Sequence, residues 1–456
     1  MKLFAHAALL PRGWADDVLI DVGADGSIAS VLANARPDGA ERVAGSLIPG
    51  MPNLHSHAFQ RALAGRTSRR GAEGDSFWTW RQAMYAFLDR VDADAFAAIA
   101  AEAYVEMLKA GYTAVAEFHY VHHDPAGRAY ADPAELARRV IAAAGDAGIA
   151  LTLLPVFYAH AGFGGTAPAA AQRRFVSSVD AFALLVAVLA RDASARGFAL
   201  GVAPHSLRAV TPDELTAIVS LIPKDAPIHI HAAEQVREVA DCVAWFGARP
   251  VEWLLDHAGL DGRWCVVHAT HMTGPEASRL AACGAIAGLA PTTEADLGDG
   301  TFPARAWLDA GGAFGVGSDS NTIVDPFAEL RQLEWSQRLA VLERNVLANG
   351  AVPVGQALYA QAARGGGAAL RQPVGAIAAG TRADFVVLDD RDPALADIPR
   401  DAIIDAAVFG PCRRPVRDVM VAGRWVVRDG HHPREDEIFA RYRKAMANVT
   451  AGRSPR

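Results

Sequence analysis

The segment that decides the fold reads LIPGMPNLHSH over residues 47–57. Its first part, Leu47–Leu54, is mostly apolar and predicts a buried strand. Side chains at positions i and i+2 of an extended chain point to the same side, so His55 and His57 project together beyond the end of this strand. Such a pair is a weak signal by itself, and its meaning depends on what stands at the ends of the other strands.

Strand-like and helical stretches alternate downstream of this segment. The expected strands are Thr113–His119, Ala150–Phe157, Ala199–Ala203, Pro227–His231, Trp264–His268, Ala285–Leu289 and Ala313–Gly317. The clearest expected helices are Asp94–Lys109, Pro133–Ala147 and Pro212–Leu221. Thr211 before Pro212 is a typical helix start. Together with Leu47–Leu54, eight strands with helical crossovers predict an α/β fold, a (β/α)8 TIM-like barrel over residues 49–370.

The two ends of the chain have a different character. Residues 1–48 and 371–456 contain short apolar strands separated by turns, with hairpin turns at Asp25-Gly26 and Ala422-Gly423. Neither end has enough strands to be stable alone, so we expect the two to form one composite β-sandwich domain. The Ala- and Gly-rich stretch Ala362–Ala369 leads back to this domain and is expected to be the loosest part of the chain.

Composition and charge exclude several classes of protein. Of the 456 residues, 51% are hydrophobic and 21% are charged, so the chain buries a large core and is not disordered. A net charge of −7 disfavours nucleic acid as a partner, and no apolar run is long enough for a membrane helix. The cysteines show no paired spacing and Met1–Leu10 does not resemble a signal peptide, so we expect a cytoplasmic protein with reduced thiols.

Side chains suited to metal binding or proton transfer recur at the predicted strand ends. His231 and Glu234 follow the fifth strand, His268 ends the sixth, and Asp319 follows the eighth. The chemistry of a barrel lies at the carboxyl ends of its strands. Imidazoles with a carboxylate suit Zn²⁺ or a similar metal, so the pattern predicts a metal site at the barrel mouth. His229 shares a face with His231 but lies deeper in its strand, and we interpret it as a core residue.

Two arginines are candidates for holding an anionic substrate. Arg208 comes shortly after the fourth strand, and Arg81 lies in an expected aromatic-rich loop after the first. A guanidinium group presents a fork of donors that matches a carboxylate. In a chain of net negative charge, an anion needs local cations of this kind.

The order of the metal-type residues along the chain resembles the amidohydrolase superfamily. The set comprises His55, His57, His231, His268 and Asp319. The spacing His231-x-x-Glu234 resembles the deaminase branch of that superfamily, within which the chain is most similar to the formimidoylglutamate deiminases of bacterial histidine degradation. The stretches that carry this similarity are 49–65, 77–81 and 203–208. The resemblance covers nearly the whole chain, including the split β domain.

The resemblance implies a hydrolase that converts N-formimino-L-glutamate to N-formyl-L-glutamate and ammonia, through attack of metal-activated hydroxide on the amidine carbon. The implied metal ligands are His55, His57, His231 and Asp319. The implied catalytic residues are Glu234, His268 and Asp319, and the division of proton transfers among them stays open. The implied substrate-binding residues are Gln60, Arg81, Tyr120, His205 and Arg208.

The lysines bear on the number of metals. Members of the superfamily with two metals bridge them through a carboxylated lysine at the end of the fourth strand. This chain has Val202-Ala203-Pro204-His205 there. Its lysines, Lys2, Lys109, Lys224 and Lys444, all lie away from the expected mouth of the barrel. We therefore expect one divalent transition metal per chain, Zn²⁺ in the first place and Fe²⁺ as the alternative.

Two other functions stay open on the sequence. An aminohydrolase of a nucleobase-like ring, of the guanine, cytosine or adenosine type, shares the metal ligands but needs flat apolar walls rather than two arginines. A non-catalytic scaffold on the same fold is expected to lose metal ligands, which this chain retains. The expected partner is a small anionic substrate derived from an amino acid, with no nucleic acid and no membrane, and a homodimer stays open.

Overall fold

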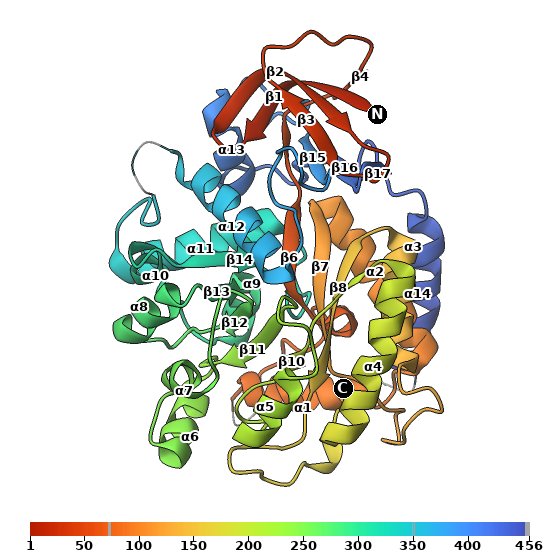
Figure 1. The fold of residues 1–456 in the computed structure, drawn as a ribbon, viewed down its shortest axis with the longest axis vertical. Coiled ribbons are helices and arrows are strands. Elements are labelled where there is room, and N and C mark those ends of the chain that lie inside the picture. The colour runs from red at the N-terminus through yellow and green to blue at the C-terminus, as the bar shows by residue number, and fades with distance from the viewer. Residues whose placement is uncertain (72–73, 349, 351, 452–456) are drawn as a thin grey trace.

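The computed structural model describes residues 1–71, 74–348, 350 and 352–451, so residues 452–456 of the predicted β domain lie outside the described residues. Figure 1 shows a body of strands and helices with a separate sheet at one end, built from the red and blue ends of the chain. The strands of the body are β6 (Met51–Ser56), β7 (Tyr112–His119), β8 (Ala150–Phe157), β9 (Ala199–Leu200), β10 (Ala203–Pro204), β11 (Ile228–Ala232), β12 (Trp264–His268), β13 (Ile286–Leu289) and β14 (Ala313–Val316).

These strands close into a barrel. Strands β6, β7, β8 and β10 pair in parallel in one sheet, where β9 also pairs with β8, and β11 to β14 pair in parallel in a second sheet. Parallel bridges join the two sheets on both sides, from Val202 to Ile228 and from Ser56 to Asp319. The predicted (β/α)8 barrel is confirmed, except that the fourth predicted strand is divided into β9 and β10.

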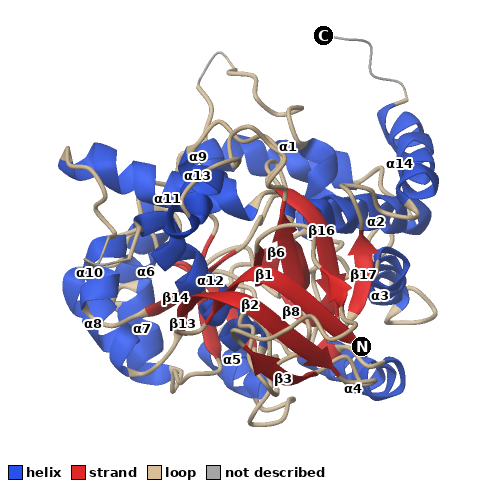
Figure 2. Cartoon of the chain, turned by 90° about the horizontal axis from the view of Figure 1, so that it is seen from above, coloured by secondary structure: helices blue, strands red, loops and turns tan. Residues whose placement is uncertain are grey.

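Helices surround the barrel strands, as the blue ribbons of Figure 2 show. The α-helices are α1 (Phe77–Leu88), α2 (Ala93–Ala110), α3 (Glu135–Ala147), α4 (Val179–Arg196), α5 (Pro212–Val219), α6 (Val236–Phe246), α7 (Pro250–His257), α8 (Gly274–Ala282), α9 (Pro291–Leu297), α10 (Ala304–Asp309), α11 (Pro326–Val341), α12 (Val354–Leu370), α13 (Ile403–Phe409) and α14 (Glu435–Thr450). The 3-10 helices are η1 (Ala58–Leu63), η2 (Ala170–Gln172) and η3 (Arg400–Ala402). The predicted helix start is confirmed. Thr211 caps α5, its side chain accepts a hydrogen bond from the backbone N–H of Glu214, and Pro212 is the first residue of the helix.

Both ends of the chain contribute to the separate sheet, as predicted. Its strands are β1 (Lys2–Leu10), β2 (Gly13–Val22), β3 (Ile28–Leu32), β4 (Glu41–Arg42), β5 (Leu47–Pro49), β15 (Phe385–Leu388), β16 (Val416–Val421) and β17 (Arg424–Val427). They bond into one sheet in the order β17-β16-β15-β5-β1-β2-β3, with β4 beside β1. The pairing of β15 with β5 joins the two ends. The two predicted hairpins are β2–β3 and β16–β17.

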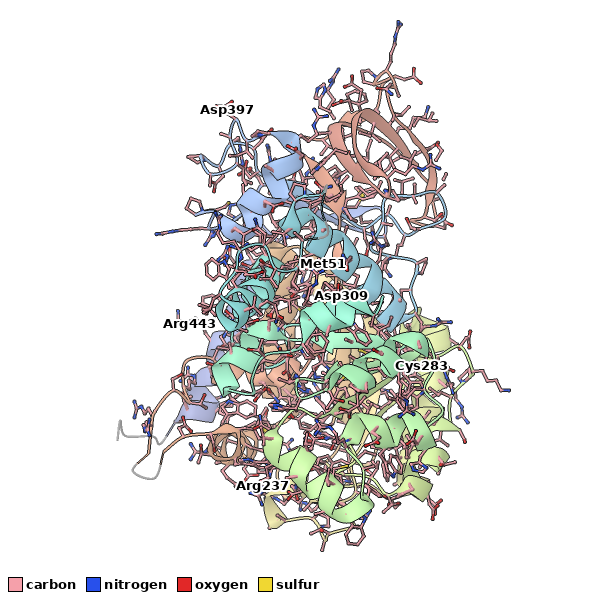
Figure 3. All side chains as sticks on the ribbon, turned by 90° about the vertical axis from the view of Figure 1, so that its left-hand side faces the viewer. Met51, Arg237, Cys283, Asp309, Asp397 and Arg443 are labelled. Carbon is pink, nitrogen blue, oxygen red and sulfur yellow. The ribbon has the colours of Figure 1, made fainter. Side chains whose placement is uncertain are left out.

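The predicted strand Leu47–Leu54 is divided at Gly50 between the two parts of the molecule. The Gly50 backbone N–H bonds to the Asp384 carbonyl, whereas the next N–H, of Met51, bonds to the Gly111 carbonyl. A Cβ atom at Gly50 would stand 2.3 Å from Cγ2 of Thr113, so only glycine fits at this crossing. Met51 is buried where the sheet meets the barrel (Figure 3). An uninterrupted apolar run carries no mark of such a change of partner strands.

The stretch Ala362–Ala369 is not loose, and that expectation was wrong. It forms the buried part of α12, which packs on β14 and β6. A Cβ atom at Gly365 would stand 1.9 Å from the Phe314 carbonyl oxygen, and one at Gly366 would stand 3.0 Å from Pro52. The small residues therefore serve close packing of a helix on the barrel, although in isolation they favour flexibility.

Two further expectations can be compared with the structure. All four cysteines are free, as expected of reduced thiols. Among the described residues, none of the helices has the length and apolar character that crossing a membrane requires. The last helix, α14, lies beside α2 on the flank of the barrel, although the sequence analysis grouped its residues with the β domain (Figure 1).

Candidate active site

The three histidines predicted as metal ligands meet at one end of the barrel. His55 is the last residue but one of β6, His57 follows that strand, and His231 lies on β11. One ring nitrogen from each lies within 4.8 Å of the other two, and all three side chains are buried. The Nε2 atoms of His55 and His231 face each other at 3.1 Å. Donor atoms that converge in this way around a common point form the geometry of a metal site.

Asp319 completes this cluster from the end of β14. Its Oδ1 lies 3.6 Å from Nε2 of His55 and 3.3 Å from Nε2 of His57. The backbone of Asp319 is in the left-handed region, with φ of 42°. Such a conformation is costly for a residue other than glycine and persists only where surrounding contacts impose it. The structure therefore brings together the four groups that the sequence analysis proposed as ligands.

Asn321, which was not predicted from the sequence, holds the turn at Asp319. Its Nδ2 donates to the backbone carbonyls of Asp319, at 2.9 Å, and of His57, at 3.0 Å. The Asp319 backbone N–H bonds in turn to the His55 carbonyl. The amide thus links the first and last strand ends, so that the carboxylate of one faces the imidazoles of the other. A polar residue two positions beyond a candidate ligand was the available signal.

The environment of the histidines favours their neutral form. Nδ1 of His57 donates to the Phe118 carbonyl at 3.0 Å, and Nδ1 of His231 donates to the His205 carbonyl at 3.0 Å. Each of these rings therefore has its lone pair on Nε2, which faces the cluster. Burial lowers the pKa of His57 to about 3, and burial with the neighbouring rings lowers the pKa values of His55 and His231 well below their ordinary range. Neutral imidazole is the form that binds a metal.

His268 lies among carboxylates rather than among the ligand atoms. Its Nε2 is 3.8 Å from Oε1 of Glu234 and 3.8 Å from Oδ2 of Asp319, while its Nδ1 is 3.3 Å from Oε1 of Glu294. Burial disfavours the charged ring, but these three carboxylates outweigh it and raise the pKa of His268 to about 10. Glu294, on α9, was missed by the sequence analysis because it lies beyond the seventh strand, where no residue had been singled out.

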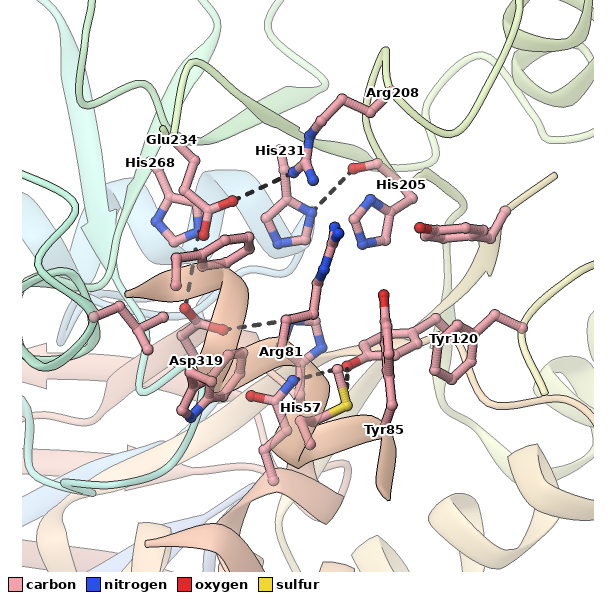
Figure 4. Close-up of a pocket in the computed structure, with 17 residues that line it drawn as sticks. His57, Arg81, Tyr85, Tyr120, His205, Arg208, His231, Glu234, His268 and Asp319 are labelled. Carbon is pink, nitrogen blue, oxygen red and sulfur yellow. Dashed lines mark hydrogen bonds and ion pairs between the residues drawn. The ribbon is translucent and has the colours of Figure 1, made fainter. Parts of the chain in front are cut away.

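A cleft opens from the cluster toward solvent, and all five predicted substrate-binding residues line it (Figure 4). Its lining residues are His57, Gln60, Phe77, Trp80, Arg81, Met84, Tyr85, Tyr120, Tyr158, Phe175, His205, Arg208, His231, Glu234, His268, Leu297 and Asp319. Its apolar and aromatic members were not predicted from the sequence; they come from α1, from the segment between β8 and α4, and from the end of α9. Within the described chain, no lysine lines this cleft.

Arg81 lies on α1, which corrects the prediction that it belongs to a loop. The helix begins after Ser76 and buries Phe77, Met84 and Tyr85, so tertiary packing stabilises a helix whose first turn consists of aromatic residues and Thr79. The Arg81 guanidinium stacks on the ring of Trp78, with Cζ 4.6 Å from the ring centre. Its Nε is buried and has no hydrogen-bond partner in the described structure, as expected of a donor that meets a ligand.

Arg208 lies in the same cleft but is already shared between two carboxylates. Its Nη2 is 3.4 Å from Oε2 of Glu234, and its Nε is 3.8 Å from Oε1 of Glu238. Glu238, on α6, is buried and also accepts the backbone N–H of Glu234 at 3.0 Å. The guanidinium therefore does not present its whole fork and charge to the cleft, which the sequence alone did not indicate.

Gln60 and Tyr120 form a hydrogen-bonded pair on the wall near His57. Nε2 of Gln60 donates to the Tyr120 hydroxyl at 2.8 Å, while its Oε1 is buried without a partner in the described structure. The His205 ring stands 4.9 Å from the ring of His231, measured between centres. By contrast, His229 does not reach the cleft, because its Nε2 donates to the Ala369 carbonyl, as its interpretation as a core residue predicts.

Known proteins resemble this chain over nearly its whole length. A family model described as "Amidohydrolase family" matches residues 46–426, and one described as "Formimidoylglutamate deiminase HutF, N-terminal domain" matches residues 2–45. The formimidoylglutamate deiminase of Pseudomonas aeruginosa is 52% identical over 435 residues, which are 95% of this chain and 96% of that protein. A 5-methylthioadenosine/S-adenosylhomocysteine deaminase of Halobacterium salinarum is 29% identical over 94% of this chain and 92% of that protein.

Solved structures show the same architecture. An amidohydrolase from Brucella melitensis is 48% identical and matches with a TM-score of 0.93, covering 99% of this chain and 100% of that one. An adenosine deaminase from Xanthomonas campestris with bound zinc matches with a TM-score of 0.82 at 22% identity, covering 98% of each chain. At that identity the second likeness concerns the fold alone.

Proposed function

The chain belongs to the amidohydrolase family, whose members are metal-dependent, and we infer that it is a formimidoylglutamate deiminase. It hydrolyses N-formimino-L-glutamate to N-formyl-L-glutamate and ammonia. The observation that carries this function is the presence of Arg81 and Arg208 in the same cleft as the three-histidine cluster (Figure 4). A linear substrate with two carboxylates and an amidine matches a cleft that has cations at one end and metal-type donors at the other.

The donor set fits one divalent transition metal. Three neutral imidazoles and one carboxylate are the ligands that Zn²⁺ prefers, and Fe²⁺ is the alternative. Nε2 of His231 carries a lone pair and lies 3.1 Å from Nε2 of His55, so both nitrogens can turn to one cation between them. We therefore assign Nε2 of His55, His57 and His231 and the Asp319 carboxylate as ligands. When bound, the metal lowers the pKa of a water molecule to about 7, so that hydroxide exists at neutral pH.

We assign the proton transfers of the reaction to Asp319 and Glu234, the two carboxylates beside Nε2 of His268. Asp319 lies next to His268, so its carboxylate can receive the proton of the attacking water while the protonated ring stabilises the negative charge that develops. Glu234 lies beside the same Nε2 of His268 as Asp319, and its other oxygen contacts Arg208 in the cleft. We assign Glu234 the delivery of a proton to the amidine nitrogen, which then leaves as ammonia.

Substrate orientation comes from the cleft walls. The arginines pair with carboxylate, since an unpaired buried charge costs several kcal/mol. Gln60, Tyr120 and His205 offer further polar contacts beside the cluster. The partner is thus a small dianion derived from an amino acid, held so that its amidine carbon faces the ligand cluster.

The alternatives considered from the sequence have less support. A nucleobase-like ring does not need two guanidinium groups beside it, and the long 52% match is to a deiminase of a linear amidine. A non-catalytic scaffold has no use for a complete ligand cluster next to Glu234 and His268.

An ammonia-release assay tests the function. Purified protein is incubated with N-formimino-L-glutamate, guanine, cytosine and adenosine in parallel. We expect turnover of the formimino compound only, with N-formyl-L-glutamate as the co-product by mass spectrometry. Preference for a nucleobase or a nucleoside would establish the ring aminohydrolase instead, and no turnover of any of them would support the scaffold.

A further inference from the structure

Tyr158 is a buried residue that lines the cleft, and its hydroxyl has no part in the proposed mechanism. It directly follows β8 and lines the cleft on the side of His205, with the two ring centres 4.8 Å apart in an edge-to-face contact. Phe175 packs on it as well, with ring centres 5.8 Å apart. These two rings hold the Tyr158 ring in one place, at the carboxyl end of the third barrel strand, where substrate-contacting residues of this fold occur.

Gln172 determines which way the Tyr158 hydroxyl donates. Oε1 of Gln172 accepts the backbone N–H of Ala169 at 2.8 Å, so the amide nitrogen of the same side chain must face Tyr158. Nε2 then donates to the Tyr158 oxygen at 2.6 Å. Gln172 is buried, and both its amide oxygen and its amide nitrogen are hydrogen-bonded. Rotating the amide group by 180° would therefore break both hydrogen bonds. The Tyr158 oxygen thus already accepts a hydrogen bond, and its own proton is left to donate elsewhere.

Tyr158 lines the same cleft as Arg81, Arg208 and Tyr85, and its hydroxyl hydrogen-bonds to that of Tyr85. Burial and the neighbouring Tyr85 raise the pKa of Tyr158, whereas the guanidinium groups of Arg208 and Arg81 lower it. The balance keeps Tyr158 protonated at neutral pH, so it is a neutral donor close to two cations. Tyr85, one turn after Arg81 on α1, is the present hydrogen-bond partner of the Tyr158 hydroxyl, and an arriving carboxylate takes its place as the acceptor of the Tyr158 O–H.

Arg81 and Arg208 alone do not supply enough hydrogen-bond donors for a substrate carboxylate. Arg208 shares its charge with Glu234 and with the buried Glu238. In the described part of the chain, Arg81 has no ion pair, but its guanidinium stacks on Trp78 and offers a buried Nε. A carboxylate has about four lone-pair sites, more than these two groups satisfy when one is already shared. A neutral hydroxyl donates a further hydrogen bond to the substrate carboxylate. Because it carries no charge, Glu238 does not attract it away from the substrate as it attracts Arg208.

We propose that the Tyr158 hydroxyl, aimed by Gln172, is the third donor of the carboxylate subsite formed by Arg81 and Arg208, and that it selects substrates with a carboxylate rather than a carboxamide there. This inference rests on the proposed function, because it assigns a residue to one of the two carboxylates of the substrate. Gln172 is a positioning residue in this scheme, since it acts on the substrate only through Tyr158.

The test compares Tyr158→Phe with the wild type on three substrates. These are N-formimino-L-glutamate and the two derivatives in which either its α- or its side-chain carboxylate is replaced by a carboxamide. We expect a loss in kcat/KM of roughly tenfold or more on the dianion, mainly through KM, as for a hydrogen bond to a charged group. One of the two carboxamides should show a loss within twofold, which identifies the carboxylate that Tyr158 contacts. An equal loss on all three substrates, or none on the dianion, would overturn the proposal.

Gln172→Met and Tyr359→Phe complete the experiment. Gln172→Met should raise KM for the dianion in the same direction but less, and it should add nothing in the Tyr158→Phe background. Additive effects would show that Gln172 does not act through Tyr158. Tyr359→Phe removes a buried hydroxyl that donates to the Pro49 carbonyl outside the cleft, so it controls for the loss of any tyrosine hydroxyl and should leave KM unchanged.

Calorimetric titration with glutarate separates this inference from the proposed function. Binding of a plain dicarboxylate does not depend on turnover. If the wild type binds glutarate and Tyr158→Phe binds it at least several-fold more weakly, the subsite stands even when no formimino compound is hydrolysed. If the wild type hydrolyses N-formimino-L-glutamate but both proteins bind glutarate equally, the function stands and the role of Tyr158 does not.

Discussion

At the scale of single residues, backbone carbonyls decide what the buried histidines can do. The carbonyls of Phe118 and His205 accept hydrogen bonds from Nδ1 of His57 and of His231, respectively, so both Nε2 lone pairs face the same point. His268, whose partner is Glu294 instead, sits among acids and favours a proton. Histidine in one surrounding thus suits the proposed ligand role, and in the other it suits the proposed role in proton transfer.

Asp319→Asn separates the two roles proposed for Asp319, as a metal ligand and as a proton acceptor. The amide retains a ligand oxygen but cannot take a proton, so we expect a protein that keeps part of its metal and loses about 10²- to 10⁴-fold in kcat. Metal analysis and steady-state kinetics on the same preparation measure both. Asp309→Asn, the same exchange in a surface ion pair with Arg305, is the control. A kcat near that of the wild type would remove Asp319 from proton transfer.

Arg208→Lys tests the geometry of the cationic end. An ammonium group keeps the charge but lacks the fork, and it cannot reach both Glu234 and Glu238 as the guanidinium does. We expect KM for N-formimino-L-glutamate to rise roughly tenfold or more, and Arg208→Met to raise it further. Kinetics of the two variants decide the question. If both stay within about twofold of the wild type, well below the tenfold that 1.4 kcal/mol represents, Arg208 is not a carboxylate anchor.

At the scale of the elements, glycines set how closely α12 approaches the barrel. Gly365→Ala places a Cβ atom against the Phe314 carbonyl oxygen, so a rigid backbone must move, and we expect a loss of about 1–3 kcal/mol in the free energy of unfolding. Gly145→Ala, on α3, meets nothing within 4 Å and should instead stabilise by about 0.5–1 kcal/mol. Denaturant titration of both variants measures the difference. Equal effects would contradict close packing as the reason for the glycines.

The contact between α2 and α14 predicts a dependence of stability on pH. Burial alone raises the pKa of Glu435, but hydrogen bonds from Lys109, His431 and the His432 backbone lower it to about 2. The unfolded value is about 4.3, so the stabilising contribution is complete above that pH and is lost as the pH falls toward 2. Because the pair is partly exposed, solvent screens it, and Glu435→Gln should cost less than about 1 kcal/mol at pH 7.

Paired denaturant titrations from pH 7 down to pH 3 check this contribution. The difference in the free energy of unfolding between the wild type and Glu435→Gln should narrow as the pH falls below about 4.3. Below that pH the unfolded chain binds a proton at Glu435 that the folded protein does not bind, and this favours unfolding of the wild type. A difference that is constant across the range would show that Glu435 contributes through packing and not through its charge.

At the scale of the whole molecule, a metal held by the proposed ligands would join the two halves of the barrel. His55 and His57 come from the first sheet, whereas His231 belongs to the second and Asp319 follows its last strand. We expect about one metal per chain by elemental analysis. Removing it with a chelator should abolish turnover and lower Tm, because a ligand that binds only the folded state stabilises it. Zinc should restore both, and a reproducible content of two metals per chain would contradict the assignment.

The sequence by itself determined the type of fold and the inventory of reactive groups. Apolar runs at regular spacing predicted the barrel strands, and the histidines and Asp319 at their ends predicted where a metal could bind, because strand ends of a barrel converge whatever the loops do. The long apolar run at Leu47–Leu54 and the glycines of Ala362–Ala369 misled the local reading. Their meaning depends on Thr113 and Phe314, which are far away in the chain.

Only the tertiary structure decided how the groups work together. The helix that carries Arg81, the sharing of Arg208 between Glu234 and Glu238, and the aim of Tyr158 by Gln172 all depend on contacts between residues from different elements. Composition and periodicity report how one residue relates to its neighbours in the chain. Hydrogen bonds, burial and charge at the cleft depend on distances across the fold, and these exist only once the barrel has closed.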